Sequence, residues 1–113
     1  PRRHSTKELT KMMEEGIPFR EFWVLGDPII GYLSFNRELS QIMGLYVDFP
    51  GVGAGKLLLD KVKRGKNFIQ LWSHLANTSA HRFYSREGFS KMELNQSGQD
   101  GIPEIRFEWK IIA

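Results

Sequence analysis

The chain has 113 residues, of which 41% are hydrophobic and 26% are charged, and its formal net charge is +3. This length supports one hydrophobic core, so we predict a single domain over residues 1–113. The chain contains no cysteine, which excludes disulfides, thiolate metal sites and a cysteine nucleophile. No apolar run approaches the roughly 20 residues that cross a bilayer, and the polar start does not read as a signal peptide. We therefore expect a cytoplasmic protein with no membrane partner, and we expect no metal because His4 and His81 also lack the spacing of metal ligands.

The first half of the chain predicts one helix and three strands. Ser5–Gly16 has apolar residues at helical spacing behind a Ser or Thr cap, which predicts a helix. Residues 22–25 and 29–35 are apolar runs around a Gly-Asp-Pro turn and predict a hairpin. Residues 41–47 predict a third strand, in which Gly44 indicates a bulge or a close backbone approach. Because the chain does not begin with Met, we expect a fragment, a processed form or a chain whose true start is not represented, which would leave its N-terminal helical region truncated.

The second half predicts two helices and three strands after a glycine-rich loop. The loop is expected at residues 50–55, the helices at 56–64 and 78–87, and the strands at 67–75, 91–94 and 105–111. The whole order is helix, three strands, helix, strand, helix and two strands. This order predicts a mixed sheet with helices packed on it, in the α/β (α+β) class.

The loop Gly51–Lys56 has the composition of a phosphate-binding loop. Backbone amides at a helix N-terminus carry partial positive charge, and glycines let a phosphate approach them closely. A nucleoside-triphosphate loop is excluded because Pro50 occupies the place of its first glycine and Leu57 that of its Ser or Thr. The dinucleotide fingerprint is excluded because Lys56 stands where its last glycine belongs. A tight strand-to-helix turn without a ligand is the structural alternative.

Two motifs resemble the GCN5-related N-acetyltransferase (GNAT) superfamily. Pro50–Gly55 reads Pro-x-x-Gly-x-Gly, which is similar to the superfamily's Gln/Arg-x-x-Gly-x-Gly/Ala apart from its first residue. Asn77–Ala80 reads Asn-x-x-Ala after a strand, and Tyr84 and Gly88-Phe89 follow at the superfamily's spacing. The resemblance implies the GNAT fold, a mixed and mostly antiparallel central sheet with splayed strands, flanked by helices.

The resemblance also implies a site for acetyl-CoA (coenzyme A). The superfamily holds the pantetheine arm between two splayed strands, here residues 41–47 and 68–74, and the pyrophosphate on the glycine loop. The cofactor-binding residues implied here are Leu45, Val47, Val52, Gly53, Ala54, Gly55, Lys56, Asn77, Ala80, Phe83 and Tyr84. Asn77 has the alternative of a plain helix cap, Lys56 that of a solvent-facing residue, and Phe83 that of a core residue.

The reaction implied by the resemblance is transfer of an acetyl group from acetyl-CoA directly to a primary amine of a small molecule, a peptide or a protein. Tyr84 resembles the phenol that stands near the cofactor sulfur and donates a proton to the departing thiolate, with a core tyrosine as the alternative. Some members carry a basic Glu on the first splayed strand, but the aligned position here holds Gln41. Glu38 and His74 are therefore the candidate bases, and water is a third carrier of the proton.

The main alternative is a non-catalytic acyl-CoA-binding or sensor module of the same fold. The departures from the superfamily's pattern at Pro50 and Gln41 favour this alternative. A nucleic-acid-binding domain rests on the net charge alone, so we expect no nucleic-acid partner. The resemblance also allows a homodimer, although no residue of the sequence indicates one.

Overall fold

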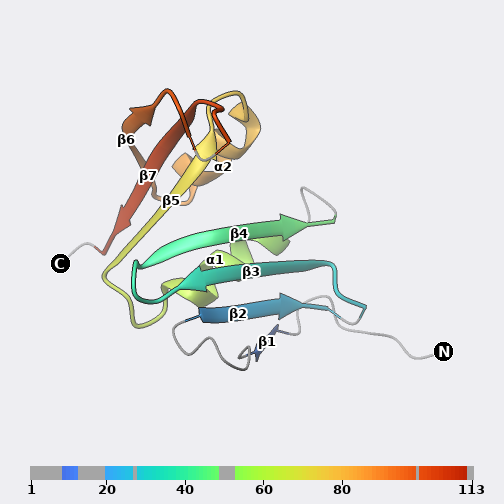
Figure 1. Ribbon diagram of the computed structural model, residues 1–113. Helices are drawn as coiled ribbons and strands as arrows, with labels where there is room; N and C mark the ends of the chain where they lie inside the picture. Colours follow the sequence, from blue (N-terminus) through green and yellow to red (C-terminus); the bar gives the residue numbers. More distant parts are fainter. Residues whose placement is uncertain (1–8, 13–19, 27, 49–52, 99, 112–113) are drawn as a thin grey trace. The chain divides into compact units, whose positions relative to one another are not determined.

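A computed structural model describes residues 9–12, 20–26, 28–48, 53–98 and 100–111 (Figure 1). The chain divides into two units, Pro1–Lys66 and Asn67–Ala113. Among the described residues, each unit contains one helix, and every strand pair within a unit is antiparallel.

The strands of the first unit pair with one another in chain order. They are β1 (Leu9–Met12), β2 (Arg20–Leu25), β3 (Gly31–Asn36) and β4 (Gln41–Val47). Such an order needs only short connections, and β2, β3 and β4 are joined by hairpin turns. The chain then continues from β4 toward the helix of this unit.

Helix α1 (Ala54–Lys63) covers one face of this sheet and packs against β2, β3 and β4. The helix residues that face the sheet are completely buried: Leu58, Leu59 and Val62. Leu33 of β3 is equally buried, and a Cβ on Gly31 would lie only 3.3 Å from Leu58 Cδ1. The core of the first unit therefore lies between α1 and β3.

The helix predicted for Ser5–Gly16 is wrong over the residues that the structure describes. Leu9–Met12 forms strand β1, with Leu9 opposite Leu25 and Met12 opposite Phe22 of β2. The rest of the predicted helix lies outside the described residues. Apolar spacing over four residues suits a strand as well as a helix, and the hydrogen bonds to β2 decide between the two. The described part of the chain thus opens with a strand, in contrast to the predicted order.

The other predicted helices and strands are confirmed, with ends that shift by one or two residues. Helix α1 begins two residues earlier than predicted, so Ala54 and Gly55 belong to its first turn and not to a loop. Strand β3 begins at Gly31, two residues later than predicted, because Ile30 N donates to Leu25 O at 2.8 Å and closes the hairpin turn.

The irregularity that Gly44 indicated is a bulge between β3 and β4. Ser34 pairs with Gly44, but the next residue, Phe35, pairs with Ile42. Met43 is therefore the extra residue on β4, next to the glycine.

A buried ion pair joins the end of the first unit to β2. Lys66 Nζ lies 3.4 Å from both carboxylate oxygens of Glu21, and the two side chains are 19% and 5% exposed. Trp23 Nε1 donates to Glu21 Oε2 at 2.5 Å, and the Lys66 ammonium stands 4.7 Å from the ring centroid of Phe35. The residue that follows the α1 C-terminal turn is thereby fixed against the sheet.

The second unit pairs its strands in the order β5-β7-β6 and carries helix α2. Its elements are β5 (Phe68–His74), α2 (Thr78–Arg86), β6 (Ser90–Asn95) and β7 (Glu104–Lys110). Burial alternates along β5, with Ile69, Leu71 and Ser73 on the buried face, as the sequence predicts for a strand with one face in a core. Phe107 of β7 completes this buried face and contacts α2.

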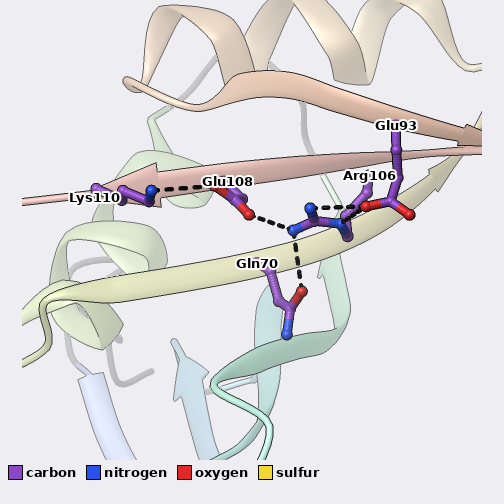
Figure 2. A network of polar contacts seen from close by, with 5 residues as sticks. All are labelled: Gln70, Glu93, Arg106, Glu108 and Lys110. Carbon is purple, nitrogen blue, oxygen red and sulfur yellow. Dashed lines mark hydrogen bonds and ion pairs between the residues drawn. The ribbon is translucent and has the colours of Figure 1, made fainter.

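The opposite face of this sheet carries a polar network centred on Arg106 (Figure 2). Arg106 donates to Glu108 Oε2 at 2.6 Å, to Glu93 Oε1 at 2.8 Å and to Gln70 Oε1 at 3.2 Å. Lys110 Nζ adds an ion pair with Glu108 at 3.8 Å. Because these residues come from β5, β6 and β7, the guanidinium links all three strands on this face.

Candidate active site

Strand β4 directs the backbone groups of Leu45 and Val47 away from β3. Asp48 N donates to Ile30 O at 2.8 Å, so position 48 faces β3. Peptide groups alternate in direction along an antiparallel strand, and Leu45 and Val47 occupy the alternate positions of the register. Their N–H and C=O groups, which the family resemblance assigned to the pantetheine arm, therefore point to the other side of β4.

The N-terminus of α1 carries backbone donors that the helix itself does not use. Its N-cap, Gly53, has left-handed backbone angles (φ 82°), no side chain caps the helix, and no acidic residue lies in the first turn. The first backbone acceptor inside the helix is Gly53 O, which takes the Leu57 N–H at 3.1 Å. The N–H groups of Ala54 and Gly55 precede that bond and have no acceptor within the helix. Such donors at the positive end of a helix dipole suit the charge of a pyrophosphate.

The remaining candidates of the first unit are placed as follows. Lys56 Nζ forms an i,i+4 ion pair with Asp60 at 3.3 Å, and both side chains are half exposed. Glu38 is exposed in the turn before Gln41, so it lies at the end of β4 that is farther from the α1 N-terminus. Val52 lies outside the described residues.

The corner between β5 and α2 is built around Asn77. Its side chain caps α2 by accepting the Ala80 N–H at 3.4 Å, and Ser79 Oγ lies 3.5 Å from the same oxygen. The Asn77 N–H donates to His74 O, the last carbonyl of β5, at 3.0 Å. His74 itself is an exposed residue. The helix-cap alternative for Asn77 is thus present in the structure, and its exposed amide NH₂ is left to face solvent.

The ring of Tyr84 is enclosed by three phenylalanines. Its centroid lies 5.5 Å from that of Phe83, 5.8 Å from that of Phe89 and 5.6 Å from that of Phe107, each at a tilted angle. Burial raises the pKa of the Tyr84 phenol above its ordinary value of 10.0. The phenol is therefore protonated at neutral pH, and its hydroxyl has no hydrogen-bond partner among the described residues.

The predicted site residues form two groups, one in each unit. The first combines the β4 backbone with the start of α1, and the second places Asn77, Ala80, Phe83 and Tyr84 on α2. The sequence singled out no role for His81, yet His81 is buried and its Nε2 lies 3.0 Å from His74 O. A polar residue three positions before a core tyrosine on one helix face was the only local signal for this contact.

Within the parts of the chain that the structure describes, no group of three or more His, Cys, Asp or Glu side chains could hold a metal ion. No helix in these parts is long and apolar enough to cross a membrane.

Comparison with known proteins gives matches along nearly the whole chain. A model of the acetyltransferase (GNAT) domain family matches residues 1–111. An uncharacterized N-acetyltransferase of Methanocaldococcus jannaschii is 37% identical over 66 residues. These cover 52% of this chain and 29% of that relative, so the chain spans less than a third of the relative's length.

Solved structures agree with this fold. A Bacillus anthracis protein assigned as a streptothricin acetyltransferase, in complex with acetyl coenzyme A, gives a TM-score of 0.75 at 19% identity, over 86% of this chain and 65% of that one. Arabidopsis thaliana Naa50, in complex with the bisubstrate analogue CoA-Ac-MVNAL, gives 0.67 at 23% identity, over 82% and 73%. At these identities the likeness shows the fold alone, and it confirms the fold class that the sequence predicts.

Proposed function

Because the chain belongs to the acetyltransferase (GNAT) domain family, we propose that it transfers an acetyl group from acetyl-CoA to a primary amine. The observation that carries the proposal is the start of α1, where a left-handed glycine precedes the N–H donors of Ala54 and Gly55, which have no acceptor in the helix. A pyrophosphate needs such donors, and none of the described residues in the first turn is acidic. The donor set therefore fits the diphosphate of coenzyme A.

We assign the pantetheine arm to the backbone groups of Leu45 and Val47. Their direction away from β3 supports this assignment, because a polar chain can pair with such groups as a strand would. Asn77 is the side chain that we assign to the arm in the second unit, since its amide nitrogen has no partner among the described residues. Phe83 and Ala80 share its helix and would contribute apolar contacts.

Tyr84 is the proposed general acid. The amine nitrogen attacks the thioester carbonyl carbon, the carbon–sulfur bond breaks, and the thiolate takes the phenol proton of Tyr84. Its raised pKa keeps the phenol protonated until it is needed. The amine proton passes to a base, for which His74 and Glu38 are the candidates and water the third carrier.

The acceptor is proposed to be a small-molecule amine or the amine of a peptide or protein. Among the similar structures, one is assigned as a streptothricin acetyltransferase and one binds a CoA–peptide bisubstrate analogue, so both classes belong in the test. A cytoplasmic location and a homodimer are further proposals that rest on the sequence and the resemblance. Size-exclusion chromatography with light scattering tests the homodimer.

A non-catalytic acyl-CoA-binding module is the second candidate. The observation in its favour is Gln41, which opens β4 at the position where some family members carry a Glu base. An amide cannot accept the proton of an ammonium group, so this chain would need another base.

Calorimetry with acetyl-CoA, with ATP and NAD as controls, tests the cofactor, and thiol release over a panel of small amines and peptides tests the reaction. We expect binding of acetyl-CoA alone and a loss of at least about a hundredfold in kcat for Tyr84→Phe. Tyr32→Phe, which alters an exposed tyrosine of β3, is the matched control. Binding without thiol release for any acceptor would favour the binding module, and no binding of acetyl-CoA by folded protein would refute both candidates.

A further inference from the structure

His81 is a buried histidine that the proposed reaction does not use. It lies on α2, three residues before Tyr84, and is 7% exposed. Its Nε2 lies 3.0 Å from the backbone oxygen of His74. A carbonyl oxygen accepts only, so Nε2 carries the hydrogen and donates it. A buried imidazole without such a bond would be unfavourable, and this bond removes most of that cost.

The His74 carbonyl holds α2 at two points. It accepts the N–H of the N-cap Asn77 at 3.0 Å as well as the imidazole of His81. Asn77 and His81 are one helical turn apart and are joined by the His81 N–H to Asn77 O bond at 3.2 Å. Two bonds to one carbonyl, one turn apart, restrict both the sliding and the rotation of α2 relative to the end of β5.

The rings of His81 and Tyr84 rest on the same side chain. Phe107 is completely buried, and its ring lies 5.2 Å from the His81 ring and 5.6 Å from the Tyr84 ring. A rotation of α2 that moved one ring on this surface would also move the other. The position of the Tyr84 hydroxyl therefore depends on the contacts of His81.

We propose that His81 is a positioning residue, whose bond to His74 O fixes the rotation of α2 and so sets the place of the Tyr84 hydroxyl. This inference rests on the proposed role of Tyr84 as the acid. His81 itself does not touch the reacting atoms: it acts through the helix and through Phe107. Removing the bond from His81 to His74 O should lower the rate of acetyl transfer. The affinity for acetyl-CoA should stay unchanged, because Asn77 keeps its own bond to His74 O.

Two substitutions separate the bond from the bulk of the side chain. The Nε2 of a glutamine stands at the same number of bonds from the backbone as the Nε2 of histidine, so His81→Gln can restore the donor, whereas His81→Asn is too short. We expect kcat to fall about tenfold in His81→Asn and to recover to within about twofold of wild type in His81→Gln. We expect the Kd of acetyl-CoA to stay within about twofold in both. Arg82→Ala, at the neighbouring exposed position of α2, is the control and should change neither value.

A second readout does not depend on activity. The chain has three tyrosines, so replacing Tyr32 and Tyr46 by Phe leaves Tyr84 as the only phenol in an ultraviolet titration. We expect its pKa to move toward the ordinary value in His81→Asn and to return in His81→Gln. If wild type transfers no acetyl group, the proposed function fails while this titration still tests the positioning.

An unchanged kcat and an unchanged Tyr84 titration in folded His81→Asn would overturn the inference. A loss of equal size in the Asn and Gln variants would also overturn it, since the donor would then be irrelevant. If His81→Asn does not fold, Phe107→Leu replaces it, because this variant shortens the ring that His81 and Tyr84 share. It should lower kcat with little change in the Kd of acetyl-CoA, and a normal kcat would overturn the inference.

Discussion

Removing Lys66 from its ion pair with Glu21 should destabilise the protein far more than removing the lysine of an exposed ion pair. Lys66→Met removes the ammonium that stands over the Phe35 ring and keeps most of the apolar stem of the side chain. Glu21, which is 5% exposed, then keeps only the Trp23 Nε1–H as a donor among the partners that the structure describes. A carboxylate in that position is buried without its counter-charge.

The size of the effect follows from distance and burial. At 3.4 Å, two unit charges attract by about 5 kcal/mol if the effective dielectric constant is about 20. Desolvation of both groups offsets much of this gain, but removing a single partner leaves that desolvation in place and typically costs about 3–5 kcal/mol. Because Lys66 keeps 19% of its exposure, we expect the lower end, about 3 kcal/mol.

Urea unfolding, followed by circular dichroism and tryptophan fluorescence together, measures this free energy and tests two-state behaviour. Lys56→Met is the matched control, because its pair with Asp60 is half exposed and should contribute less than about 0.5 kcal/mol. In the double variant Glu21→Gln with Lys66→Met, part of the loss should be regained, since no charge stays buried. Equal losses in Lys66→Met and Lys56→Met would refute the argument from burial.

Two further outcomes are expected from the same reasoning about space and charge. Gly31→Ala should destabilise the protein by about 1–2 kcal/mol in the same urea assay, because its Cβ would lie 3.1 Å from Tyr46 O and 3.3 Å from Leu58 Cδ1. The control is Gly44→Ala, whose Cβ meets nothing within 4 Å and whose effect should stay within about 0.5 kcal/mol. An equal loss of stability at both sites would contradict the packing argument. Burial raises the pKa of Tyr84 above 10.0, so the folded state binds that proton more tightly than the unfolded chain does. Its contribution to stability is complete below pH 10 and is lost as the pH rises through the raised pKa. Thermal unfolding across this range should show that loss in wild type and not in Tyr84→Phe, and parallel curves would argue against it.

The sequence predicted the fold correctly where the spacing of apolar residues shows which side chains are buried. Along β5 the buried residues alternate as expected, because one face of that strand packs against a core and the other does not. The pattern of Leu9–Met12 does not show which side chains are buried, because four residues with an apolar residue at each end fit a helix as well as a strand. Its partner, β2, begins eight residues after β1 ends, and propensity does not include the hydrogen bonds made with another segment.

The candidate site divides in the same way. The glycine-rich loop and the helix after it were predicted from local sequence, with the helix starting two residues too late, and the structure shows Gly53 as the left-handed N-cap of that helix. The pair of Lys66 with Glu21 joins residues 45 positions apart, and the contact of His81 with Phe107 joins a helix to the last strand. Neither contact can be predicted from neighbouring residues, because each depends on how the strands pair, which the sequence pattern does not specify.

The contacts assigned to acetyl-CoA in the first unit and those assigned in the second unit also differ in how substitutions affect them. In the first unit the assigned contacts are backbone groups, of β4 at Leu45 and Val47 and of α1 after Gly53, so most side-chain changes there leave them in place. In a sequence, such a backbone site is recognised mainly by the lack of bulky residues in the loop. In the second unit the assigned contacts are side chains, those of Asn77 and Tyr84, and each can be removed by one substitution. Variants that truncate a side chain should therefore separate binding from chemistry only in the second unit. In the first unit the informative change is an added side chain. We expect Gly53→Val to weaken acetyl-CoA binding, because valine disfavours the left-handed backbone conformation that Gly53 adopts.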